Sequence, residues 1–351
     1  MSTRVVTEPV AHDQPRRRAS ARLTRLMPTL TCARPPGDHA PVLPPPGPDD
    51  VARAFLERAA ELDAAHAGRR GPLRPYLWRW AAALLRPPAP PQAEPLPPVH
   101  PGELAATFIG HATVLLRYAD TRILTDPALG RFAGPVARVR AAAAASLDLA
   151  AIDLCLISHA HFDHLDPPSL RRLPRGATVV VPPRCAELCS RLGFARVIEL
   201  AVGEAIAHRG VEVIAVPARH YGGRSLLDPR RRGGCGYIIR GNGPTAYFAG
   251  DTGYFSGFLD VGQRYAPDLA LLPIGAYRPL AFRRYHMSPL DAVYAFADLG
   301  ARVLLPVHHG AFPLSYEPLD EPAAWMRELA REHGLTDRVA LLEPGQTRVL
   351  R

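Results

Sequence analysis

Short apolar runs that end at a histidine or an aspartate recur along this chain between residues 104 and 308. Each run has the length of a β-strand and stops at a turn residue, which is typical of buried strands joined by loops. Loops at one edge of a rigid sheet commonly carry binding and catalytic side chains. The pattern therefore predicts strand ends that converge on one polar site, and it disfavours histidines scattered through a core. The polar residues in question are His111, Asp126, His159, His220, Asp251 and His308.

The same reasoning gives a set of expected elements. Strands are expected at residues 104–109, 114–118, 122–126, 154–157, 178–182, 196–200, 211–217, 235–239, 245–249, 269–274, 303–307, 339–342 and 347–350. Helices are expected at residues 51–62, 75–86, 168–173, 185–192, 288–299 and 322–332, and residues 143–151 fit a short helix or a loop. Ser288 and Pro289 suit the cap and the first position of their helix.

The densest group of polar side chains is the segment from His159 to His164, which directly follows an apolar strand. His159 and His161 are two residues apart and point the same way in an extended chain. Asp163 and His164 follow a bend, so their side chains can face a second ligand position beside the first. Imidazole and carboxylate groups together suit zinc and its first-row neighbours. The spacing therefore predicts ligands for two adjacent metal ions, and a merely His-rich polar loop is the less favoured interpretation.

Residues further along the chain complete two ligand sets. A two-metal hydrolase needs ions about 3.5–4 Å apart and a carboxylate that spans them. Asp251 suits the bridging position, because glycines on both sides allow a sharp bend there. Asp163 and Asp251 are thus expected to act in catalysis as well as in metal binding. The first set comprises His159, His161 and His220, and the second comprises Asp163, His164 and His308.

Further side chains are candidates for supporting roles. Asp126 and His111 are expected either to hold a ligand histidine in one tautomer or to serve only as turn residues. His286 is expected to donate a proton to the leaving group or to hold a phosphate, with a plain helix-entry role as the alternative. Next to His308, His309 is the weaker ligand candidate. Arginines beside the site segments suit phosphate binding, namely Arg219, Arg224, Arg278, Arg283 and Arg284.

Composition limits the partners and the compartment. The net charge is +9, and all 42 basic residues are arginine, which favours acidic substrates, phosphates or anionic membrane surfaces. No basic segment interleaved with aromatics is present, so nucleic acid is not an expected partner. The five cysteines have no repeated paired spacing and suit a reducing compartment. Without a secretory signal or a long apolar span, the expected location is cytoplasmic, with possible membrane association.

Changes in residue composition divide the chain into three regions. Residues 1–48 are rich in proline and arginine and are expected to be disordered. Residues 49–98 form a helical extension and a proline-rich linker. Their second helix, with Trp78 and Trp80, suits packing on the main domain or a position at a membrane interface. Residues 99–351 form the expected hydrolase domain.

The ordered motifs resemble those of the metallo-β-lactamase superfamily over roughly residues 100–335. Within it, Gly110-His111-Ala112-Thr113, Phe248 to Tyr254 and Pro273 to Tyr277 are similar to the phospholipases D that hydrolyse N-acylphosphatidylethanolamine and to their bacterial relatives. The resemblance implies a four-layer αββα sandwich of α/β (α+β) class with a Pro-rich, partly helical N-terminal extension. It implies two Zn²⁺ per chain and cleavage of a phosphodiester by a bridging hydroxide, which releases phosphatidic acid.

Other functions stay open at the level of the sequence. A lactonase or another metal-dependent hydrolase of a small phosphorylated or acyl substrate is the first alternative, and Mn²⁺ or Fe²⁺ could replace zinc. A metal-binding protein without turnover is disfavoured by the complete ligand set, and a drug-resistance β-lactamase by the missing secretion signal. In the phospholipase, segments matching poorly to residues 1–98 contribute to a lipid groove and a homodimer; the sequence leaves the oligomeric state of this chain open.

Overall fold

A computed structural model of the chain describes residues 73–91, 95–224 and 232–351, all of which belong to one compact unit, Leu43–Arg351. The predicted disordered segment 1–48 and the predicted helix 51–62 lie outside the described residues. Within them, no helix is long and apolar enough to cross a membrane. The predicted boundary at residue 98 stays a prediction.

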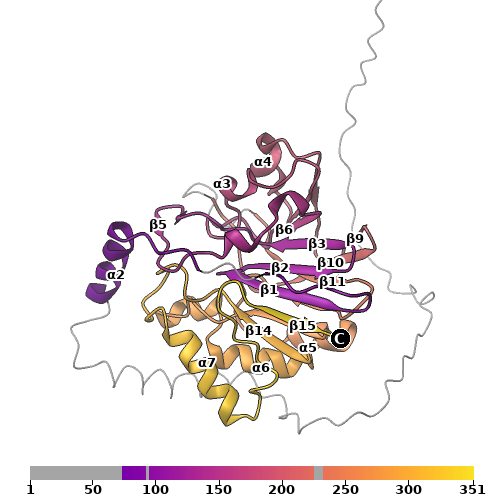
Figure 1. The fold of residues 1–351 in the computed structure, drawn as a ribbon. Coiled ribbons are helices and arrows are strands. Elements are labelled where there is room, and N and C mark those ends of the chain that lie inside the picture. The colour runs from indigo at the N-terminus through magenta and orange to yellow at the C-terminus, as the bar shows by residue number, and fades with distance from the viewer. Residues whose placement is uncertain (1–72, 92–94, 225–231) are drawn as a thin grey trace, which may run out of the picture. The chain divides into compact units, whose positions relative to one another are not determined.

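Two β-sheets form the centre of the fold (Figure 1). The first has the order β15-β1-β2-β3-β6-β7-β8, with β1 Leu104–Gly110, β2 Thr113–Tyr118, β3 Thr121–Thr125, β6 Leu154–Leu156, β7 Thr178–Val181, β8 Arg196–Glu199 and β15 Thr347–Leu350. The second has the order β14-β13-β12-β11-β10-β9, with β9 Ala205–His208, β10 Val211–Pro217, β11 Cys235–Arg240, β12 Ala246–Phe248, β13 Leu269–Pro273 and β14 Val303–Val307. A small hairpin joins β4 Phe132–Ala133 to β5 Val136–Ala137.

Helices cover the outer face of each sheet (Figure 1). The second sheet packs against α5 Gly257–Tyr265, α6 Pro289–Leu299 and α7 Glu321–Glu332. The first sheet packs against the short helices α3 Pro167–Leu170 and α4 Ala186–Cys189 and the 3-10 turns η1 Ala144–Ser146, η2 Leu149–Ala151 and η3 Ser190–Leu192. Helix α2 Leu73–Leu85 and the 3-10 turn η4 Leu280–Arg284 complete the described helices. The layers confirm the predicted αββα sandwich.

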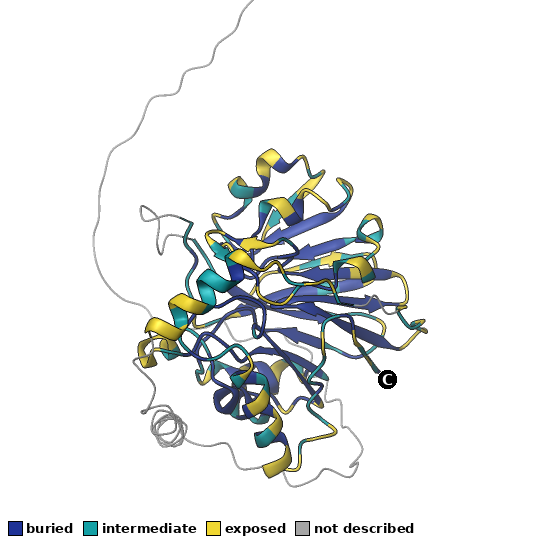
Figure 2. Ribbon diagram, turned by 60° about the vertical axis from the view of Figure 1, so that its left-hand side comes forward, coloured by how far each residue is buried: buried dark blue, intermediate teal, exposed yellow. Residues whose placement is uncertain are grey.

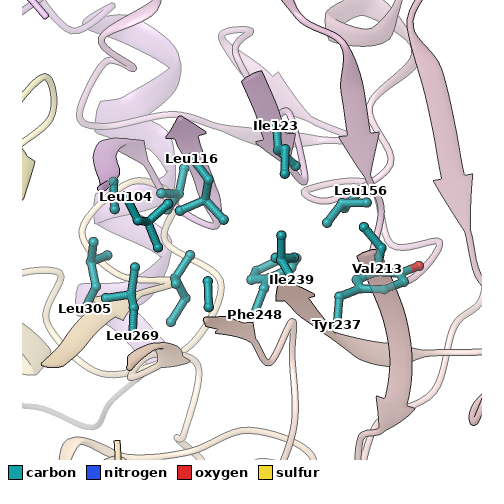
Figure 3. Close-up of a cluster of buried hydrophobic side chains, with 14 of the residues drawn as sticks. Leu104, Leu116, Ile123, Leu156, Val213, Tyr237, Ile239, Phe248, Leu269 and Leu305 are labelled. Carbon is teal, nitrogen blue, oxygen red and sulfur yellow. The ribbon is translucent and has the colours of Figure 1, made fainter. Parts of the chain in front are cut away.

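Side-chain alternation along the strands explains why two layers of sheet are stable together. Leu104, Ala106 and Phe108 of β1 enter the core between the sheets, whereas Ile109 packs under the outer helices. Figure 3 shows this inter-sheet cluster, in which Leu116 and Ile123 face Phe248 and Ile239. The central strands of both sheets are buried, whereas exposed residues lie on the helices, the loops and the edge strands β8, β9 and β15 (Figure 2).

Most predicted elements are confirmed, with instructive exceptions. Residues 339–342 are not a strand, because Val339 makes only an isolated bridge with Leu304. The expected helix 185–192 is broken into α4 and η3 and ends at left-handed Gly193. The sequence does not predict α5, which contains Gly257 and Gly262 and so lacks strong helix propensity. The short edge strand β9 is likewise not predicted from the sequence.

Candidate metal centre

The structure brings all the predicted ligand residues to one edge of the sandwich. His111 lies in the β1–β2 turn, Asp126 follows β3, and the segment His159 to His164 follows β6. From the second sheet, His220 follows β10, Asp251 follows β12 and His308 follows β14, while His286 precedes α6. Residues more than 190 positions apart therefore meet because each strand ends at the same edge. Their ligand atoms form four overlapping groups within 4.8 Å.

The three-histidine set is assembled as the sequence predicts. His161 Nδ1 lies 2.9 Å from His159 Nε2 and 3.3 Å from His220 Nε2. The His220 Nδ1 atom lies 2.9 Å from the carbonyl oxygen of Tyr285, which only accepts hydrogen bonds. In neutral His220 the hydrogen is therefore on Nδ1, and the Nε2 lone pair faces the other two rings. Three ring nitrogens that converge in this way fit a cation.

The second set surrounds the carboxylate of Asp163. Its Oδ2 atom lies 3.3 Å from His164 Nε2 and 3.4 Å from His308 Nε2. Asp251 lies between the two sets, because its Oδ2 atom is 3.2 Å from His164 Nε2, 3.1 Å from His308 Nε2 and 3.9 Å from His159 Nε2. The geometry agrees with the predicted bridging position of Asp251.

Unpartnered buried atoms show that protein groups alone do not satisfy this cluster. The Nε2 atoms of His164 and His308 and the Oδ1 atom of Asp251 make no hydrogen bond, although each is buried. Native proteins pair nearly all such groups, and leaving one unpaired costs about 1–3 kcal/mol. Bound cations would satisfy these atoms together, so the donor set fits a metal centre.

The two carboxylates at the cluster favour added positive charge, whereas the rings of His220 and His286 stay neutral. Burial lowers the pKa of His220 to about 3 and that of His286 to about 4, and it outweighs the opposite effect of Asp251. Burial also acts downward on His308, but Asp251 and Asp163 outweigh it and raise the pKa of His308 to about 9. Asp251 is buried and Asp163 is half-buried, and His164 nevertheless holds the pKa of both carboxyls well below the usual range.

A buried network behind the cluster orients two of its histidines. Asp126 Oδ2 accepts from His164 Nδ1 at 2.6 Å and from Ser158 Oγ at 2.5 Å. Because the Ser158 hydroxyl donates to Asp126, its oxygen accepts from His159 Nδ1 at 3.0 Å. Both rings consequently present Nε2 to the centre. The sequence predicts no role for Ser158, whose one signal is its position directly before His159.

His111 supports the second set from the other side. Its Nε2 atom lies 2.9 Å from Asp163 Oδ2, and its carbonyl oxygen accepts from the backbone N–H of His308 at 2.9 Å. Burial, followed by the neighbouring His308, lowers the pKa of His111 to about 3. His111, Asp126 and His308 all have positive φ values, of 62°, 30° and 59°. Backbone strain of this kind often accumulates at functional sites.

The two remaining candidate histidines, His286 and His309, differ in their distance from the cluster. His286 belongs to a group with His220 and Asp251, and its Nδ1 atom is 3.6 Å from Asp251 Oδ2. His309 belongs to none of the ligand groups of the described residues and stacks on Phe108.

Most of the candidate arginines bind other protein groups. Arg219 donates to the carbonyl oxygen of Tyr254, and Arg224 donates to the carbonyl oxygens of Ala160 and Leu165. Two more form ion pairs, Arg278 with Glu321 and Arg283 with Asp291. Arg284 is exposed and lies near the ring of Tyr285.

Comparison with known proteins places this geometry in a family. Residues 121–309, more than half of the chain, match the β-lactamase superfamily domain. The chain belongs to the metallo-β-lactamase superfamily. A metal-dependent hydrolase from Methanopyrus kandleri is 31% identical over 69% of this chain and 97% of its own length. The N-acyl-phosphatidylethanolamine-hydrolyzing phospholipase D 1 of Caenorhabditis elegans is 33% identical over 65% of this chain and 71% of its own length.

Solved structures of the metallo-β-lactamase superfamily share the fold. The metallo hydrolase Igni18 from Ignicoccus hospitalis superposes with a TM-score of 0.55 and 26% identity, over 71% of this chain and 99% of that protein. This protein is therefore a metal-dependent hydrolase of the superfamily. Its His and Asp clusters are the candidate metal-binding groups.

Proposed function

We propose that this protein is a dizinc phosphodiesterase of phospholipase D type that acts on N-acylphosphatidylethanolamine-like lipids. The observation that carries the proposal is the pair of ligand sets that share Asp251. His159, His161 and His220 would hold one zinc ion, and Asp163, His164 and His308 would hold the other. Bound there, the two ions would lower the pKa of a water molecule and neutralise charge on the phosphoryl oxygens.

Side chains around the metal centre would orient the ligand histidines and the substrate phosphate. Asp126 and Ser158 keep His159 and His164 in the tautomers that present Nε2. Burial keeps His286 neutral near pH 7, because its pKa is lowered to about 4. Of its two predicted roles, holding the phosphate as an N–H donor is therefore the better supported. The depth of the cluster would exclude bulk water from the reacting atoms.

Exposed apolar side chains around the centre support a lipid substrate. Trp78 and Leu85 of α2 are 75% and 80% exposed. Others lie on β4, just after β5, in the segment His159 to His164 and on η4, namely Phe132, Val139, Phe162, Leu280 and Phe282. Phe162 directly follows His161, and the rings of Phe282 and His286 are 6.3 Å apart. Large exposed apolar groups that gather in one region mark interaction sites.

Contacts connect the β4–β5 hairpin with Phe162 and with α2. Phe162 packs against Gly134 of the hairpin, and Arg131 of the hairpin donates to the carbonyl oxygen of Leu84 in α2. Arg74 and Arg86 are exposed at the two ends of α2. Arginine beside tryptophan and leucine suits the interface of an anionic membrane. We therefore propose peripheral membrane contact through α2, the hairpin and η4.

A substrate panel tests the proposal. Purified zinc-loaded protein would be given N-acylphosphatidylethanolamine vesicles, bis-p-nitrophenyl phosphate, a lactone and a cephalosporin. We expect turnover of the two phosphodiesters, and the lipid should release phosphatidic acid. In ¹⁸O-labelled water the label should enter phosphatidic acid, because the water attacks phosphorus. Turnover of the lactone alone would instead favour the lactonase alternative, and label in the released alcohol would exclude attack at phosphorus.

A further inference from the structure

Glu317 is a buried carboxylate that holds the loop after strand β13. Its Oε1 atom accepts from the backbone N–H of Ala276 at 2.7 Å, and its Oε2 atom accepts from that of Arg278 at 3.2 Å. The residue is only 8% exposed. A carboxylate whose two oxygens bind backbone amides two residues apart fixes the path of the main chain between them. Ala276 is held at φ 62°, a conformation that a non-glycine residue rarely adopts.

The loop that Glu317 holds packs directly against a proposed zinc ligand. Gly275 has no room for a side chain, since an added Cβ atom would lie 2.2 Å from the carbonyl oxygen of His308. The backbone N–H of Ile274 also donates to the carbonyl oxygen of Val307. A change in the path of residues 275–278 would therefore displace the backbone of His308.

The same loop continues to two further residues of the centre. After Arg278 the chain forms η4 and reaches Tyr285, whose carbonyl oxygen fixes the ring of His220 through Nδ1 at 2.9 Å. His286 is the next residue. The end of η4 packs against Gly253 in the Asp251 turn, where an added Cβ atom would lie 2.4 Å from the carbonyl oxygen of Arg284.

The segment that carries Glu317 is itself anchored from the opposite side. Arg79 of α2 donates to the carbonyl oxygen of Tyr316 at 2.8 Å. The rings of Tyr76 and Tyr316 meet edge to face with centroids 5.2 Å apart. The position of Glu317 is therefore set by contacts of its own segment with α2, independently of the loop that its carboxylate binds.

We propose that Glu317 is a positioning residue that fixes the loop from Gly275 to His286 and thereby orients His220, His286 and His308. This inference rests on the proposed function only in taking those histidines as site residues. Removing one acceptor should change the arrangement of the ligands while the ligands themselves stay present. Positioning groups behind metal ligands typically contribute about 10- to 100-fold to activity or metal affinity.

The test compares Glu317→Gln with the unchanged protein, both loaded with Co²⁺. Glu332→Gln, an exposed carboxylate on α7, is the matched control. We expect Glu317→Gln to bind the same amount of cobalt but to show a shifted visible spectrum. Its kcat for bis-p-nitrophenyl phosphate should fall about 10- to 100-fold with KM nearly unchanged. A spectrum and kcat equal to those of the control would overturn the proposal.

Two further measurements separate positioning from general stability and from the substrate assignment. If Glu317→Gln loses its cobalt and unfolds early, the residue has a general folding role and the proposal fails. Arg79→Met weakens only the outer anchor and should produce a smaller spectral shift in the same direction. If neither protein hydrolyses a phosphodiester, the proposed function fails, but the cobalt spectra still decide the role of Glu317.

Discussion

Asp126 Oδ2 lies 2.6 Å from Nδ1 of His164, and neither side chain is exposed to solvent. The same oxygen accepts from Ser158, so one carboxylate determines the ring state of two proposed ligands. In Asp126→Asn, an amide NH₂ group in that place would repel the His164 Nδ1 hydrogen. We expect zinc affinity to fall about 10- to 100-fold. Competition with a chromophoric chelator measures this directly.

The matched control for this change is Asp120→Asn. Asp120 is exposed in the turn between β2 and β3, and its substitution makes the same change in charge. Zinc affinity in that variant should equal the value for the unchanged protein. An Asp126→Asn protein that also retains full affinity would show that the tautomers are set without this carboxylate.

Asp251→Asn should affect both ligand sets at once. The Asp251 Oδ2 atom faces ring nitrogens from each set, and an amide cannot replace a bridging carboxylate. Zinc content should fall from about two equivalents per chain, and turnover should fall more than about 100-fold, equivalent to the several kcal/mol that such metals supply. Elemental analysis and rate measurements check this, with the exposed α5 residue Asp260 changed to Asn as the control. Normal zinc content would remove Asp251 from the bridge.

The sequence predicted well which histidines and aspartates lie together, because each of them follows the end of a strand that can be recognised locally. An apolar run that stops at His220 or Asp251 reveals both the strand and the residue that it presents. The role of Ser158 cannot be predicted from the sequence, because a serine beside a histidine has no distinctive spacing. The sequence also does not predict the contact between Glu317 and the loop of Ala276, because the two segments share no local pattern.

Secondary structure was predicted less well where tertiary contacts decide it. Helix α5 contains Gly262, which no propensity argument favours. An added Cβ atom there would lie 2.6 Å from the carbonyl oxygen of Asp298, so the glycine permits close packing on α6. Residues 339–342 have a strand-like composition, but only Val339 pairs, through one bridge to Leu304.

Gly250→Ala should destabilise the fold by about 3 kcal/mol, which combines left-handed strain with overpacking. Gly250 has φ 61°, and an added Cβ atom would lie 2.3 Å from the Cβ atom of Ser158. Gly300 is the matched control, since it has φ 59° but no atom within 4 Å of an added Cβ. Gly300→Ala should cost only about 1 kcal/mol. Urea unfolding of the metal-free proteins gives both values, and equal losses would show that the contact with Ser158 is unimportant.

The double variant Trp78→Ala, Leu85→Ala should weaken binding to vesicles of anionic phospholipid. Burying a large apolar side chain contributes about 1.5–3 kcal/mol, so affinity should fall by at least about 10-fold. Hydrolysis of soluble bis-p-nitrophenyl phosphate should stay unchanged, because neither residue belongs to the metal centre. Leu259→Ala removes an exposed apolar side chain from α5 and should leave vesicle binding intact. Co-sedimentation measures the partition, and equal binding by all three proteins would place membrane contact elsewhere.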